Sequence, residues 1–234
     1  MNMAEELKNG FEEVAFLKSS YWVALFVTIQ TVLLILLLKF NMRQYVLAGS
    51  APEFFSAAAP QAVILLFVSL LILKRLGVDF RKTWRDWAAN YKRDIALGTL
   101  YFAGCLALGY LLHLTGYPWN LPQDKATALI DNALHWGIPG FSGFLFLTCV
   151  FTPLAEELFY KRLLYAGVRQ EMSALKSVIL CSLLFALIHP KATVLIVFTG
   201  NLLTYYMYEK HKRLFANIVL HSLMNFFVIL NKAF

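Results

Sequence analysis

The sequence predicts an all-α protein, a polytopic transmembrane helix bundle of about seven spans plus interfacial helices. Of its 234 residues, 59% are hydrophobic and only 15% are charged, whereas a soluble domain carries about 25% charged residues. The apolar residues form long runs without two-residue alternation, which favours helices over strands. Because every backbone group in a bilayer needs an internal hydrogen-bond partner, these runs are expected to cross the membrane as helices.

The expected elements begin with an amphipathic N-terminal segment at residues 1–20, whose apolar face can lie on the bilayer. A single membrane domain is expected over residues 21–234. Its predicted spans are roughly 21–39, 55–74, 95–114, 141–168, 174–190, 193–209 and 213–231. Two interfacial helices are expected between spans, at "RKTWRDWAANYKRD" (81–94) and "TALIDNALHWG" (127–137). In the first of these, aromatic residues recur at helical spacing among Lys and Arg, as suits a membrane interface.

Basic residues predict the orientation of the bundle. They concentrate at 74–94, 161–176 and 210–213, and they are few in the loops between these segments. Since cytoplasmic loops carry an excess of Lys and Arg, seven spans place the N-terminus in the cytoplasm. The net charge of +7 is explained by these flanks and the anionic leaflet that they face. The lipid bilayer is therefore the expected partner of these charges, and nucleic acid is not.

The cysteines indicate no disulfide framework and no metal site. There are three, Cys105, Cys149 and Cys181, all in apolar segments and without a CxxC motif. Such residues are small buried apolar side chains. No cofactor is expected.

Ionisable and amide side chains interrupt the later predicted spans. Glu156 and Glu157 are adjacent in "FTPLAEELFYKRLL", His189 ends "FALIH", and His221 and Asn225 bound "HSLMN". Residues four apart on a helix share a face, so the last two project together. An ionisable residue within a span is costly and usually functional.

These side chains are expected at a similar depth. At ~1.5 Å per residue from the basic end of each helix, Glu156 and His189 lie ~20 Å deep, His221 ~12 Å and Asn225 ~18 Å. The alternative, that they only hold helices together, fits less well, because Ser, Thr or Asn can do so at a lower desolvation cost.

Together these groups predict a site that activates water. A glutamate in such a site can act as general base, and an imidazole beside it can hold the water. His221 and Asn225 could donate hydrogen bonds to an oxyanion. Lys161, four residues after Glu157, could pair with that carboxylate. This is peptide-bond hydrolysis without a Ser or Cys nucleophile.

The three stretches "EELFYK", "FALIH" and "HSLMN" resemble the motifs EExxxR, FxxxH and HxxxN of the CAAX-protease and bacteriocin-processing (CPBP, or Abi) membrane proteases. Order and spacing agree, and "TPLAEEL" is similar to the usual lead-in of that family. The resemblance covers about residues 95–230, which would form the catalytic core. It implies an integral-membrane glutamic endopeptidase.

The resemblance also implies a role for each matching residue. Glu156 would be the general base acting with His189, and Glu157 a supporting carboxylate. His221 and Asn225 would stabilise the oxyanion, with Phe185 as a packing neighbour.

One position departs from the motif. Lys161 stands where the family has Arg, and Arg162 follows it. A lysine keeps the charge but lacks the planar fork that grips a carboxylate at two points. Either Lys161 acts as a point charge, or Arg162 replaces it from another helical face.

The expected partner is a membrane-associated peptide or protein substrate, in a prokaryotic cytoplasmic membrane. In the family, CaaX tails, bacteriocin precursors, signalling peptides and sorting-signal tails are substrates, and the sequence indicates none of them in particular, nor an oligomeric state. Three alternatives stay open. They are a zinc-dependent membrane protease, for which the sequence lacks HExxH, a non-catalytic immunity or scaffold protein of the same fold, and a transporter.

Overall fold

The structure is a computed structural model that describes residues 50–75, 77–116, 123–189 and 194–233. Within these residues every regular element is a helix, which confirms the predicted fold class. Among the described residues, four stretches are long and apolar enough to cross a membrane: Ala51–Lys74, Phe80–Leu114, Gly137–Glu171 and Leu214–Asn231. The expected segment 1–20 and the first expected span, 21–39, lie outside the described residues.

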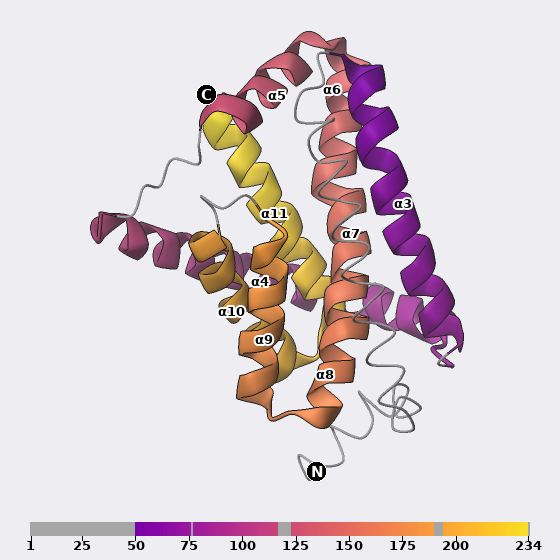
Figure 1. Cartoon of the computed structure of the whole chain (residues 1–234). Coiled ribbons are helices and arrows are strands. Elements are labelled where there is room, and N and C mark those ends of the chain that lie inside the picture. Colours follow the sequence, from indigo (N-terminus) through magenta and orange to yellow (C-terminus); the bar gives the residue numbers. More distant parts are fainter. Residues whose placement is uncertain (1–49, 76, 117–122, 190–193, 234) are drawn as a thin grey trace.

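The described helices are, in chain order, α3 (Ala51–Arg75), α4 (Phe80–Leu114), α5 (Gln123–His135), α6 (Gly137–Phe146), α7 (Thr152–Glu157), α8 (Ala166–Glu171), α9 (Ala174–Leu187), α10 (Val194–His211) and α11 (Leu214–Ala233). Two π-helical stretches, Leu147–Phe151 and Leu158–Tyr165, join α6, α7 and α8 into one long helix. This helix corresponds to the expected span 141–168 and runs beside α3 (Figure 1). The helices α3, α9, α10 and α11 correspond to the remaining expected spans, although α9 has only 14 residues.

α11 runs obliquely through the bundle and contacts α4, α7 and α10 (Figure 1). One end of the bundle is covered by α5, which lies across α6 and α11 and confirms a helix near 127–137. Among the side chains of α5 that the structure describes, the buried ones are Leu129, Ile130 and Ala133. This arrangement puts α7 and α11, the carriers of two motifs, against each other in the interior.

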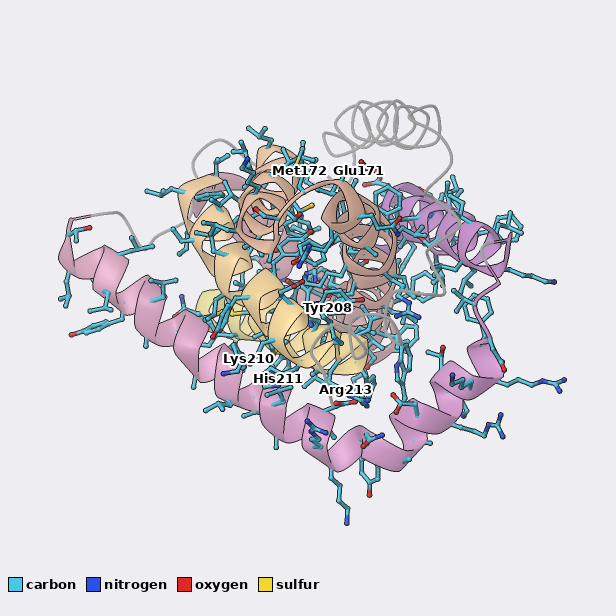
Figure 2. The ribbon with its side chains drawn as sticks, turned by 90° about the horizontal axis from the view of Figure 1, so that it is seen from below. Glu171, Met172, Tyr208, Lys210, His211 and Arg213 are labelled. Atoms are coloured by element: carbon cyan, nitrogen blue, oxygen red, sulfur yellow. The ribbon has the colours of Figure 1, made fainter. Side chains whose placement is uncertain are left out.

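The first expected interfacial helix and the third expected span are one continuous helix, α4, so their separation was wrong. Asp79 caps the start of α4, because its carboxylate accepts hydrogen bonds from the backbone N–H groups of Arg81 (2.8 Å) and Lys82 (3.1 Å). No Gly or Pro interrupts the chain between residues 80 and 97, so nothing in the backbone ends the helix there. Figure 2 shows that α4 bends as it passes the junction of α10 and α11, near Arg213.

α4 is held to α11 at two points. At Gly98 the helices approach so closely that an added Cβ would lie 2.7 Å from the carbonyl oxygen of Ala216. Near the start of α11, the Arg213 guanidinium grips Asp94 through Nε and Nη2, both at 2.7 Å. Its Nη1 reaches Asp86, also at 2.7 Å. Because the Asp94 side chain is fully buried, this bidentate pair fixes the bend of α4 against the bundle.

We expect Asp94→Asn to lower the free energy of unfolding by about 2 kcal/mol, because one amide edge would then face the guanidinium instead of an oxygen. Thermal unfolding in detergent should show a fall in Tm of about 4–8 °C. Asp86→Asn is the matched control, since the Asp86 side chain is 48% exposed and such pairs contribute about 0–1 kcal/mol. Equal effects of the two variants would contradict the assigned role of Asp94.

Candidate active site

The two adjacent glutamates of α7 meet the first histidine of α11. His221 Nδ1 lies 2.9 Å from Glu157 Oε1, and His221 Nε2 lies 3.6 Å from Glu156 Oε2. The imidazole therefore stands between the two carboxylates, in hydrogen-bond contact with one and close to the other. The expected meeting of the first and third motifs is present in the structure.

Lys161 completes this cluster on the side of Glu157. Its Nζ lies 2.7 Å from Glu157 Oε2 and 4.5 Å from the centre of the Tyr205 ring. The expected pairing of Lys161 with Glu157 is therefore present, and a cation–π contact from α10 accompanies it. Arg162 does not take this place; it interacts with Tyr208 of α10. Lys161, which stands where the motif has Arg, therefore still places a positive charge beside the Glu157 carboxylate.

The π-helical stretch that follows Glu157 positions this pair. It spans Leu158–Tyr165, and Lys161 lies within it. π-helical turns are rare and are frequently found at functional sites. The same stretch supplies several of the buried side chains of the main apolar core, among them Phe159, Tyr160 and Tyr165. The same stretch thus carries both the amine that pairs with Glu157 and aromatic side chains of the main core.

The two glutamates differ in what their oxygens contact. Glu157 uses one oxygen toward His221 and the other toward Lys161, and its side chain is only 4% exposed. The Glu156 side chain is 21% exposed, and among the described residues the basic group within 4 Å of it is His221, at 3.6 Å, longer than a hydrogen bond. Glu156 therefore has carboxylate oxygen available for another partner.

His189 reaches the site by way of Phe185. Its Nδ1 donates to the carbonyl oxygen of Phe185 at 2.8 Å, since a carbonyl can only accept. The Phe185 ring lies 4.9 Å from the His189 ring and 6.1 Å from the His221 ring. Phe185 thus packs against both histidines, and Nε2 is the nitrogen of neutral His189 left to accept a hydrogen bond.

Asn225 lies one turn beyond His221 on α11 and contacts the long helix at Thr148. Its Nδ2 donates to the carbonyl oxygen of Thr148 at 2.8 Å. This fixes the orientation of the amide, because only the nitrogen can donate. The second hydrogen on Nδ2 remains for another acceptor.

Sequence reasoning missed Tyr205 and Thr148 as parts of the site. Tyr205 is fully buried on α10, and its hydroxyl donates to the carbonyl oxygen of Tyr160 at 3.4 Å. An aromatic residue in an apolar helix carries no pattern that distinguishes a partner of Lys161 from ordinary packing. The contact at Thr148 is made by the backbone, so its side-chain type gives no signal.

Among the residues that the structure describes, no group of three or more His, Cys, Asp or Glu side chains has an arrangement suited to a metal ion. The three cysteines are buried and unpaired with one another.

Comparison with known proteins agrees with the three motifs. Residues 138–227 match the family model described as type II CAAX prenyl endopeptidase, Rce1-like. No significant match was found among curated proteins or among solved structures. The matched range contains Glu156, Glu157, His189, His221 and Asn225. The segment from 138 to 227 is therefore similar to type II CAAX prenyl endopeptidases, and the long apolar helices make the chain an integral membrane protein.

Proposed function

We propose that this protein hydrolyses a peptide bond in a membrane-associated peptide or protein tail, with Glu156 as the general base that activates water. The observation that supports this assignment most strongly is the difference between the two glutamates. Glu157 is occupied at both oxygens by His221 and Lys161, whereas Glu156 keeps oxygen available and is the more exposed of the two. A base must have a free oxygen within hydrogen-bond reach of the water that it deprotonates.

The spacing of Glu156 and His221 suits a shared water. Their facing atoms are 3.6 Å apart, and a water at about 2.8 Å from each would sit beside the pair rather than between them. Glu156 would take the proton of this water as it attacks the substrate carbonyl, and would pass that proton to the departing amine when the C–N bond breaks. His189, with Nε2 as acceptor, would orient the water from the second motif.

The oxyanion formed in that attack needs donors that are already in place. In our proposal Asn225 supplies the second hydrogen of Nδ2, the first being held by Thr148. His221, protonated on both nitrogens, donates its single Nε2 hydrogen first to the water and then to the oxyanion, while Nδ1 stays with Glu157. Glu157 and Lys161 act as a fixed ion pair that holds this imidazole.

We also infer that the basic end of the bundle faces the cytoplasm. Figure 2 views the molecule from the side on which Lys210, His211 and Arg213 lie, together with Glu171 and Met172 at the junction of α8 and α9. Loops rich in Lys and Arg stay on the cytoplasmic side. Cysteine labelling of a Met172→Cys variant from either face of the membrane tests this orientation.

The substrate is best found by comparing peptides from cells that express the wild-type protein with peptides from cells that express Glu156→Gln. We expect fragments of one or a few membrane-associated peptides that appear only with the wild type. A prenylated CaaX peptide, with its unprenylated counterpart as control, is the first defined substrate to test on purified protein. Identical peptide profiles in both cell types, together with no cleavage by the purified protein, would count against protease activity.

We expect His189→Ala to reduce hydrolysis by about 10²-fold, in the range found for positioned acid–base groups. His189→Gln is the informative companion, because its side-chain oxygen can accept a hydrogen bond from water in place of Nε2. Steady-state cleavage measures both variants, and partial recovery with Gln would support orientation of water by His189. Full activity in His189→Ala would remove this residue from the mechanism.

A further inference from the structure

The carbonyl group of Thr148 has lost both of its ordinary helical donors. In an α-helix it would accept from the N–H of Thr152, but that N–H donates to the carbonyl of Leu147. In the π-helical register it would accept from residue 153, which is proline and has no N–H. The local chain therefore leaves this carbonyl oxygen without a backbone partner from either register.

The side chain of Asn225 takes the vacant place. Its Nδ2 donates to Thr148 O at 2.8 Å, across from α11 to the long helix. Pro153 is fully buried and lies three residues before Glu156. It is therefore not one of the prolines that occupy exposed turns at the protein surface. Proline within a helix costs about 3 kcal/mol, and π-helical turns are frequently found at functional sites.

We propose that Pro153 is a positioning residue that reserves the Thr148 carbonyl for Asn225 and so orients the Asn225 amide toward the reacting carbonyl of the substrate. The catalytic part of this inference rests on the proposed function; the structural part does not. A donor at residue 153 would compete for the same oxygen and release the amide. Once released, the amide could rotate, and the second hydrogen on Nδ2 would lose its fixed direction.

The test is a double-mutant cycle of Pro153→Ala and Asn225→Ala, read first by thermal unfolding in detergent. Asn225→Ala should lower Tm by about 3 °C, because it leaves the Thr148 carbonyl unpaired. In the double variant, the new N–H at residue 153 should pair with that carbonyl, so most of this loss should disappear. Additive Tm changes would overturn the inference, whether or not the protein is a protease. If Asn225→Ala does not yield folded protein, Asn225→Ser replaces it in the cycle.

The second readout is cleavage kinetics. Pro153→Ala should lower kcat about tenfold and leave KM within about twofold, since the disturbed contact acts on the oxyanion. It should add no further loss in the Asn225→Ala background. Pro139→Ala is the control. It lies at the start of the same long helix, where an added N–H has no helical acceptor to compete for, so kcat should stay unchanged. Full kcat in Pro153→Ala would overturn the catalytic part of the inference. If the wild-type protein cleaves no substrate, the proposed function fails, and the Tm measurements of the double-mutant cycle still test the contact between Asn225 and Thr148.

Discussion

Glu156→Gln is expected to reduce peptide-bond hydrolysis by about 10³-fold, since general-base catalysis contributes about 10²–10⁴-fold. The amide has nearly the same shape as the carboxylate but cannot take a proton from water. Because Glu156 has no ion pair at hydrogen-bond distance in the described residues, its replacement should leave Tm within about 2 °C of the wild type. Cleavage of a defined peptide by purified protein, with Tm measured on the same sample, tests both expectations.

Glu157→Gln is the matched comparison and should behave differently. It leaves Lys161 buried beside a neutral amide and weakens the hold on His221, so Tm should fall along with activity. A result in which Glu157→Gln loses all activity at unchanged Tm, while Glu156→Gln stays active, would exchange the roles of the two glutamates.

The helical fold followed from apolar runs that are too long for strands, and the structure kept most of the expected spans. The exception at α4 has a physical reason. Residues 81–94 carry the composition of an interfacial segment, and composition reports the surroundings of a side chain. Whether the backbone continues depends on helix-breaking residues, and none lies between 80 and 97.

The residues of the candidate site could be selected from the sequence because ionisable groups stand out in apolar sequence. Glu156, Glu157 and His221 meet as their motifs indicated, and Lys161 follows from four-residue spacing. The different roles proposed for the two glutamates could not be predicted from the sequence. They depend on which carboxylate oxygens contact the His221 imidazole and the Lys161 amine. Likewise, the partner of Asn225 is a backbone carbonyl exposed by a π-helical turn, and side-chain type does not report that geometry.

The largest stability change is expected for Lys161→Met. The amine and its partner Glu157 are both buried, and removing one member of a buried ion pair typically costs about 3–5 kcal/mol, because the other charge is left without compensation. Met fills nearly the same volume, so the effect measures charge rather than a cavity. We expect Tm to fall by about 6–20 °C, and activity to fall because Glu157 no longer holds His221 in place.

Lys161→Arg provides the control for charge. It restores the residue of the family motif, keeps a cation against the Tyr205 ring and can grip Glu157 at two points. Tm within about 3 °C of wild type and cleavage within about threefold are the expected results. A folding defect in Lys161→Arg would show that the pocket between Glu157 and Tyr205 is shaped for an amine. A fully stable Lys161→Met would instead show that Glu157 needs no buried cation. The hydrogen bond between Glu157 and His221 would then hold the imidazole without help from Lys161.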